Sequence, residues 1–208
     1  MANGNLYIVA APSGAGKTSL VSALISSTTN ILTSVSHTTR PMRPGEVNGK
    51  DYHFVDKNVF LTMKKNGDFI EHAEVFGNYY GTSSRWLDKQ LTEGIDIILE
   101  IDWQGAQQVK KLFPSSTGIF ILPPSRKTLI ERLHSRGQDS EEIIKRRTQE
   151  AITEMSHYHE FDYLIINDDF QTALLELKSI INTPRLVMSQ QKEKHAALIN
   201  HLLGISQS

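Results

Sequence analysis

The sequence contains no cysteine, and its charges nearly cancel. Among its 208 residues, 22 Lys and Arg stand against 23 Asp and Glu, so the formal net charge is −1. Without cysteine the sequence offers no disulfide scaffold, no thiolate metal site and no cysteine nucleophile, which fits a reducing compartment. The balanced charge gives no whole-protein field that would attract nucleic acid or a membrane surface, although a local phosphate site is compatible with it.

Long hydrophobic runs, internal repeats and low-complexity tracts are also missing. The longest apolar runs, such as residues 6–11, are far shorter than the ~20 residues that span a bilayer. The first five residues lack the basic region that opens a signal peptide. We therefore expect a cytoplasmic protein, built as one domain with insertions, that binds neither nucleic acid nor a membrane.

The chain does contain a recurring pair, a short apolar run followed by a helical pattern. We expect strands at residues 6–9, 95–101, 118–122 and 163–166. Helices are expected at 17–26, at 104–112, around Leu129 and Leu133, at 170–181, and finally at 186–203 after Pro184. This alternation predicts an α/β fold of three layers, in which helices cover both faces of a mostly parallel sheet.

Two stretches interrupt the alternation. Residues 37–84 are rich in Gly, Tyr, Phe, Asn and charges, and they predict a small inserted subdomain. Residues 134–147 are strongly polar, with a hinge at Gly137 and a capping box from Asp139 to Glu142, and they predict a lid. The core domain is therefore expected to comprise residues 1–36, 85–133 and 148–208.

A phosphate-binding loop follows the first expected strand. The pattern G-x-x-x-x-G-K-[ST] is matched except that alanine replaces the first glycine, in the run Ala11, Pro12, Ser13, Gly14, Ala15, Gly16, Lys17 and Thr18. Small residues let successive N–H groups curl round a phosphate, and the helix that follows adds its positive end. Lys17 would reach the β- and γ-phosphates, and the Thr18 hydroxyl would ligate Mg²⁺.

The loop alone identifies only a nucleotide binder. A GTPase is one alternative, because residues 102–105 match the D-x-x-G motif of a GTPase switch. However, the Asn-Lys-x-Asp motif with which GTPases recognise the base is absent from the sequence. The alternative, an ordinary glycine-rich turn, is weaker because a strand and a helix flank the pattern as the phosphate loop requires.

A second cluster lies in residues 38–55. Arg40 and Arg43 suit bidentate capture of a phosphate dianion, and the Tyr52 hydroxyl adds a neutral donor. A pair of arginines by itself is more often part of a solvated basic loop. At the end of the second strand, Glu100 and Asp102 lie two residues apart and so share a face, where they suit contacts to base or Mg²⁺-bound water.

Taken together, these segments resemble the guanylate kinase family, of bacterial type. Besides residues 38–55, the blocks 77–82, 102–105, 136–137 and 166–169 resemble family blocks and stand in family order. The resemblance covers nearly the whole chain. It implies a P-loop kinase fold, a GMP-binding insertion, ATP as phosphoryl donor, GMP or dGMP as acceptor and Mg²⁺ as cofactor.

The resemblance also implies residue roles. The GMP phosphate would contact Arg40, Arg43, Tyr52 and Tyr80, with Glu46 supporting the arginines. The guanine pocket would be lined by Ser36, Glu71, Thr82 and Asp102. On the ATP side it implies Arg132, Arg136 and Asn167, and the charge of the moving phosphate would be offset by Lys17, Arg40, Arg136 and Arg147. Arg146 is the weaker lid candidate, and the role of Glu100 stays open.

The guanine assignment is also reasonable chemically. A carboxylate such as Glu71 accepts from N1–H and N2–H₂ of guanine, whereas adenine presents a bare N1 acceptor there. Two rivals are considered: an inactive guanylate-kinase-like binding module, from which phosphate-loop or acceptor residues would be lost, and a kinase for another monophosphate. The final expected helix could also form a contact in a homo-oligomer.

Overall fold

The computed structural model describes residues 3–75, 77–135 and 141–204. Its core is a parallel sheet of five strands in the order β2-β7-β1-β8-β9. The strands are β1 (Leu6–Ala10), β2 (Ile31–Thr33), β7 (Asp96–Glu100), β8 (Thr117–Leu122) and β9 (Tyr163–Ile166). The four predicted strands are confirmed, whereas the edge strand β2 escaped prediction because three residues give too short a pattern.

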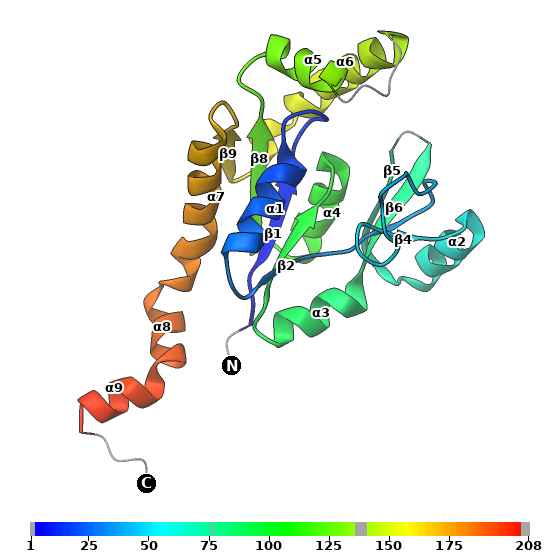
Figure 1. Cartoon of the computed structure of the whole chain (residues 1–208). Coiled ribbons are helices and arrows are strands. Elements are labelled where there is room, and N and C mark those ends of the chain that lie inside the picture. Colours follow the sequence, from blue (N-terminus) through cyan, green and yellow to red (C-terminus); the bar gives the residue numbers. More distant parts are fainter. Residues whose placement is uncertain (1–2, 76, 136–140, 205–208) are drawn as a thin grey trace.

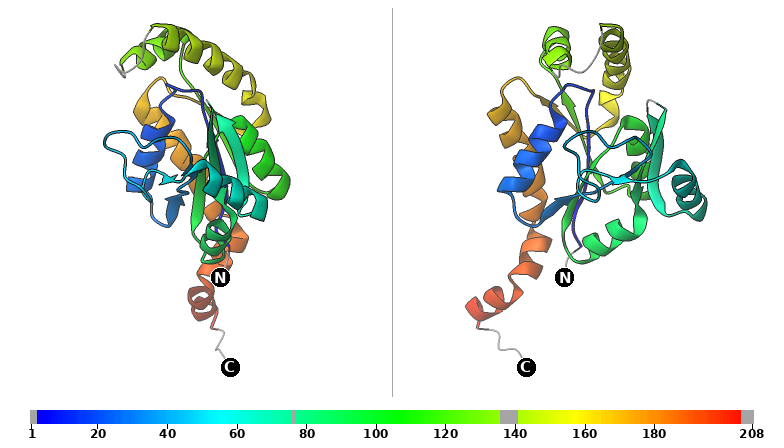
Figure 2. Two further views of the ribbon diagram at one scale, coloured as in Figure 1. Left: turned by 90° about the vertical axis from the view of Figure 1, so that its right-hand side faces the viewer. Right: turned by 45° about the vertical axis from the view of Figure 1, so that its right-hand side comes forward.

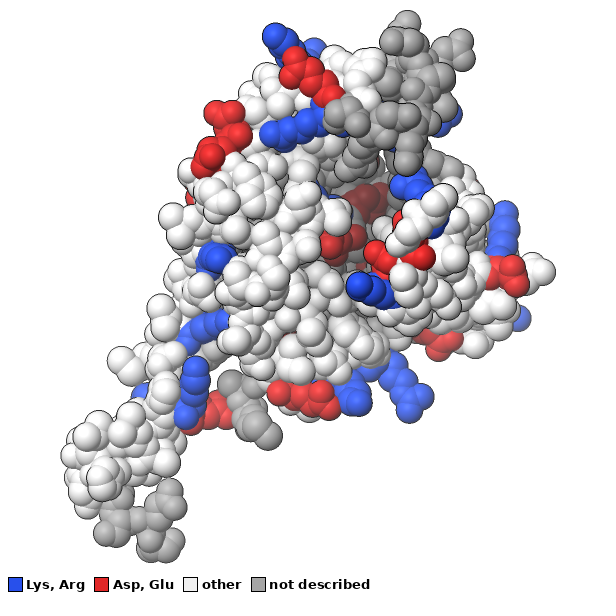
Figure 3. All heavy atoms as spheres, in the orientation of Figure 1, with Lys and Arg blue, Asp and Glu red and all other residues white. Residues whose placement is uncertain are grey.

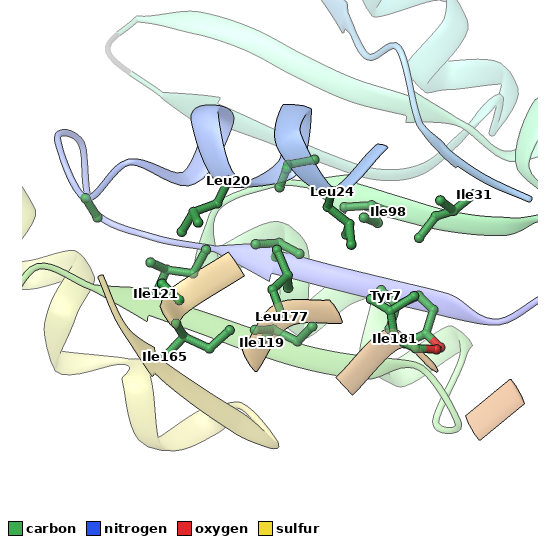
Figure 4. Close-up of a cluster of buried hydrophobic side chains, with 14 residues drawn as sticks. Tyr7, Leu20, Leu24, Ile31, Ile98, Ile119, Ile121, Ile165, Leu177 and Ile181 are labelled. Carbon is green, nitrogen blue, oxygen red and sulfur yellow. The ribbon is translucent and has the colours of Figure 1, made fainter. Parts of the chain in front are cut away.

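Helices cover both faces of this sheet (Figure 2). α1 (Lys17–Ser27) and α7 (Phe170–Arg185) lie on one face, and α3 (Ser84–Thr92) and α4 (Trp103–Leu112) lie on the other. Successive residues of β1 supply the two layers, because Tyr7 and Val9 join one core cluster while Leu6 and Ile8 join the other. Figure 4 shows Leu20, Leu24, Leu177 and Ile181 packed on the first face.

At the carboxyl end of the strands, two further helices lie beside the loop between β1 and α1 (Figure 1). α5 (Arg126–Ser135) and α6 (Glu141–Ser156) pack together through Leu129, Leu133 and Ala151, and the 3₁₀ turn η1 (Tyr158–Glu160) follows. The predicted lid hinge at Gly137 and the cap at Asp139 lie outside the described residues.

Residues 37–83 contain a separate sheet of four strands in the order β4-β3-β6-β5. Its elements are β3 (His37–Thr38), β4 (His53–Phe54), α2 (Lys57–Asn66), β5 (Phe69–Val75) and β6 (Asn78–Ser83). α2 escaped prediction, because among its residues only Phe60 is buried, stacked on Phe69 at 4.6 Å, while Val59 and Leu61 are exposed. One buried side chain does not make a helical period.

The C-terminal prediction is wrong. α7 continues through Pro184 to Arg185, and two short helices, α8 (Met188–Lys194) and α9 (Ala196–Leu202), replace the single helix expected at 186–203. A proline in the last turn removes only one main-chain donor, so it does not end the helix before it. The expected apolar stripe of Leu186, Leu198 and Leu202 is exposed, on an arm that projects from the core (Figure 1). Within the described part of the chain, no helix combines the length and apolar character needed to cross a bilayer.

The two faces of α7 give a matched test of the core. Leu177→Ala, at a fully buried position, should lower the free energy of unfolding by about 2–5 kcal/mol because it leaves a cavity under the sheet. Leu175→Ala, on the same helix with Leu175 65% exposed, should cost under about 1 kcal/mol. Urea denaturation followed by circular dichroism measures both, and equal losses would contradict the packing of α7.

Candidate functional site

The loop between β1 and α1 has the backbone of a phosphate cradle. Gly14 and Gly16 adopt φ values of 91° and 92°, which side chains other than glycine rarely tolerate. Among the described residues other than glycine, only Asn30 has a positive φ, so Ala11 needs none of the freedom that a glycine would provide. Lys17 and Thr18 begin α1, where main-chain N–H groups and the helix dipole favour an anion.

The loop is supported from behind by α5 and by the end of β9. A Cβ on Gly14 would lie 3.1 Å from Leu129 of α5, so the loop rests directly on that helix. The buried amide of Asn167 donates through Nδ2 to the carbonyl oxygen of Ala15 at 2.7 Å, and Arg132 approaches the same oxygen at 3.4 Å. The structure thus brings these two sequence-selected residues to the loop.

One residue at the loop was not singled out in the sequence. The main-chain N–H of Ser13 donates to Oε2 of Glu154, on α6, at 3.2 Å. The pKa of Glu154 is raised to about 7, mainly by burial and to a smaller extent by the charges of Asp102 and Glu150, although the Ser13 N–H and Lys17 lower it. A lone acid on an amphipathic helix carries no sequence signal for this contact. Its carboxylate takes an N–H of the kind that phosphate oxygens use.

The basic residues of the insertion are arranged around Glu46. Arg40 donates through Nη2 to Oε1 of Glu46 at 2.6 Å, and the main-chain N–H of Arg43 donates to Oε2 at 2.7 Å. The hydrogen bond from Arg40 holds the pKa of Glu46 below its usual value. Glu46 therefore fixes the Arg40 guanidinium and the turn that carries Arg43.

Two tyrosines lie beside this guanidinium. Tyr52 and Tyr80 meet edge to face with ring centroids 5.9 Å apart, and Arg40 stands 5.4 Å from the centre of the Tyr52 ring. Burial raises the pKa of Tyr52, so its hydroxyl stays a neutral donor. Arginine and tyrosine donors so close together suit a phosphate.

A second polar cluster lies between β5 and β6, which pair Glu71 with Thr82. Glu71 is only 3% exposed, and its Oε1 atom is buried with no hydrogen-bond partner. The pKa of Glu71 is raised to about 7, mainly by burial and also by the charge of Asp102, although hydrogen bonds from Thr82 lower it. Thr82 Oγ1 also lies 3.1 Å from Oγ of Ser36. A buried acceptor without a partner requires an explanation, and a ligand donor supplies one.

Asp102 caps α4 beside this cluster by accepting from the N–H of Gly105 at 2.9 Å. A Cβ on Gly105 would lie 2.9 Å from Oε2 of Glu71 and 3.3 Å from Oδ1 of Asp102, so only glycine lets both carboxylates approach the helix end. Next to Asp102, Trp103 stacks on His157 with centroids 3.6 Å apart. Figure 3 shows acidic side chains in a hollow between the core and the insertion.

The remaining sequence candidates are Arg136, Arg146, Arg147 and Glu100. Arg136 lies outside the described residues. Arg147 is half-buried on α6, the helix that also carries Glu154, and its neighbour Arg146 is exposed, 3.7 Å from Glu150. Glu100 ends β7 opposite Val9, and its charge contributes to the raised pKa of Tyr52.

Known proteins resemble this chain along nearly its whole length. A family model described as guanylate kinase matches residues 3–184. A guanylate kinase of Saccharophagus degradans is 60% identical over 97% of this chain and 98% of its own length, and one of Hahella chejuensis is 56% identical over 100% of both. A crystal structure of guanylate kinase from Anaplasma phagocytophilum has a TM-score of 0.74 at 34% identity, covering 91% of this chain and 90% of that chain.

The buried carboxylate of Glu71 should reduce stability at high pH. Because its pKa is near 7 in the folded protein and near 4.5 otherwise, the folded state loses stability as pH rises from 4.5 through 7. Glu71→Gln removes the ionisable group. The free energy of unfolding of the variant, relative to wild type, should therefore increase between pH 5 and pH 8 by at most about 3 kcal/mol.

Urea denaturation at the two pH values measures the gain. Glu131→Gln, which removes an exposed carboxylate from α5, is the control and should show no such pH dependence. A constant difference between Glu71→Gln and wild type would contradict the raised pKa.

Proposed function

The chain belongs to the guanylate kinase family, and we propose that it transfers the γ-phosphoryl group of ATP to GMP, giving ADP and GDP. The observation that carries this proposal is that a phosphate loop lies near Glu71, a buried carboxylate with one unpaired oxygen. Asp102 interacts electrostatically with both sides of the site. Asp102 raises the pKa of both Glu71 and Glu154, and Glu154 contacts the loop. The two halves of the site are therefore both within electrostatic range of Asp102.

ATP binds at the phosphate loop. Its phosphates lie against the main-chain N–H groups between Gly14 and Thr18, at the start of α1. The Lys17 ammonium reaches the β- and γ-oxygens. Mg²⁺ usually takes one or two protein ligands and completes its shell with phosphate and water. The Thr18 hydroxyl, exposed in the first turn of α1, is an oxygen ligand of that kind. When bound, Mg²⁺ neutralises charge on the phosphates.

The phosphate of GMP binds at the insertion. Arg40 and Arg43 supply charged donors and Tyr52 and Tyr80 supply hydroxyls, while Glu46 holds the arginine arrangement in place. Because Glu46 already orients Arg40 without ligand, less side-chain entropy is lost when the phosphate arrives.

Guanine is selected by Glu71. In its ionised form this carboxylate accepts N1–H and N2–H from the base, which gives its buried Oε1 atom the partner it lacks. The Thr82 hydroxyl donates to Glu71, so the Ser36 hydroxyl, 3.1 Å from Thr82 Oγ1, is the one that can donate to O6. Adenine presents an acceptor at N1, so it would leave the carboxylate facing a lone pair in a desolvated pocket, which disfavours AMP.

Transfer itself requires positioning more than covalent chemistry. A phosphate oxygen of GMP attacks the γ-phosphorus, the bond to the β–γ bridging oxygen breaks, and ADP leaves with that electron pair. Lys17, Arg40, Arg136 and Arg147 offset the negative charge as it spreads over the moving group. We propose a core of residues 1–36, 85–133 and 148–208 that carries a GMP-binding insertion at 37–84 and a lid at 134–147. The insertion and the lid close over the two substrates, so that water does not replace GMP as acceptor.

We also propose a cytoplasmic enzyme, capable of forming a homo-oligomer, that acts on nucleotides and not on nucleic acid. The competing function, an inactive binding module, is not favoured, since Lys17, Thr18, Arg40 and Arg43 are all retained.

A coupled assay of ADP release tests the activity. With ATP and Mg²⁺, GMP should stimulate release strongly, whereas AMP, dTMP, UMP and no acceptor should leave it near background. Lys17→Met should lower kcat by about 100-fold or more, because it removes the charge on the transferred group. No stimulation by any acceptor would sink the enzyme assignment and favour the binding module.

GMP binding should depend on pH through Glu71. Guanine needs the ionised carboxylate, so binding releases a proton and the affinity rises as pH increases through about 7. Between pH 6 and pH 8, the GMP affinity of wild type should rise by up to about tenfold more than that of Glu71→Gln. The variant is the reference because the GMP phosphate titrates in both proteins. Titration calorimetry measures both proteins. Parallel pH profiles for the two would contradict this role of Glu71.

A further inference from the structure

Asn167 makes an unusually close contact with the phosphate loop. It follows β9 at the carboxyl edge of the sheet, is only 4% exposed, and donates from Nδ2 to the carbonyl oxygen of Ala15 at 2.7 Å. A Cβ on Gly16 would lie 2.3 Å from the same Nδ2 atom. The amide therefore rests against the backbone of the loop, in a place that any side chain on Gly16 would occupy.

A second donor converges on the same point from another element. Arg132, on α5, approaches the Ala15 oxygen through Nη1 at 3.4 Å and donates through Nη2 to the main-chain oxygen of Asn167 at 3.1 Å. The main-chain N–H of Asn167 donates in turn to Leu122 of β8 at 2.8 Å. Asn167 is thus held by the sheet and by α5, and it can hold the loop.

The geometry of the peptide unit connects this contact to phosphate binding. In a planar trans peptide the C=O and the N–H point in opposite directions. The carbonyl of Ala15 and the N–H of Gly16 belong to one such unit, so drawing the carbonyl toward Asn167 turns the N–H of Gly16 the other way. A carbonyl that turned round would present negative charge to a phosphate instead of a donor.

We propose that Asn167 is a positioning residue of the phosphate loop, which holds the Ala15 carbonyl back and so directs the Gly16 N–H toward the phosphates of the donor. This inference rests on the proposed function, because it takes the loop to bind polyphosphate. It differs from the adenine-side role that the family resemblance implies. The amide is buried and already bonded to the loop, so its effect reaches the ligand through the backbone.

The two roles predict different responses to a ligand that has no base. We would measure the affinities of inorganic tripolyphosphate and ADP, each with Mg²⁺, by titration calorimetry. Asn167→Leu keeps most of the side-chain volume and removes the donor, and Asn167→Ala removes both. Asn58→Leu, at an exposed position of α2, is the control.

Both Asn167 variants should lose affinity for tripolyphosphate and ADP by the same factor, about tenfold. The buried Ala15 carbonyl then keeps only the longer contact with Arg132, at 3.4 Å, and the loop reorients. Their affinity for GMP should match wild type, which distinguishes loop positioning from general damage to the fold. Asn58→Leu should bind all three ligands as wild type does.

Three results would overturn the proposal. A loss of affinity for ADP alone would show that Asn167 contacts the adenine base. Unchanged affinity for both ADP and tripolyphosphate would show that the contact with Ala15 does not affect phosphate binding. Equal losses for GMP and the polyphosphates would reduce the residue to a structural role. Failure of the proposed function looks different, because wild type itself would then bind neither ADP nor tripolyphosphate.

Discussion

The five core strands all run in the same direction, and the site depends on this constraint. Parallel pairing brings the carboxyl ends of β1, β7 and β9 to one edge of the sheet. The phosphate loop leaves β1 there, Asp102 follows β7, and Asn167 follows β9. The chain separates these residues widely, yet each is delivered to the same edge by a strand that is buried for its own hydrophobic reasons.

Like charges are concentrated at that edge. Asp102 lies within electrostatic range of both Glu71 and Glu154, and burial is the main reason that the pKa of each glutamate is raised to about 7. Such an arrangement is unfavourable in the free protein, since buried carboxylates lose hydration and repel one another. Bound groups can reverse this balance: guanine brings donors to Glu71. Stability is thus given up at the site for the sake of recognition.

Two glycines allow polar side chains of the site to lie directly against the backbone. Gly16 allows Asn167 to lie against the phosphate loop, and Gly105 allows Glu71 and Asp102 to lie against the end of α4. In both places a methyl group would stand within 3 Å of a polar atom that the site uses. These glycines connect the loop conformation, the helix cap and the polar groups, so each half of the site tolerates little change in its backbone.

The amino-acid sequence by itself determined the α/β class, four of the five core strands, the phosphate loop and the family, because these depend on local periodicity and on residue order. It did not determine β2, α2 or the break between α8 and α9, since short or half-exposed elements carry too weak a pattern. Nor could it pair Glu154 with Ser13, or Asn167 with the carbonyl of Ala15. Those contacts join residues more than 100 positions apart, and only the packing of α6 and β9 around the loop decides which polar atoms meet.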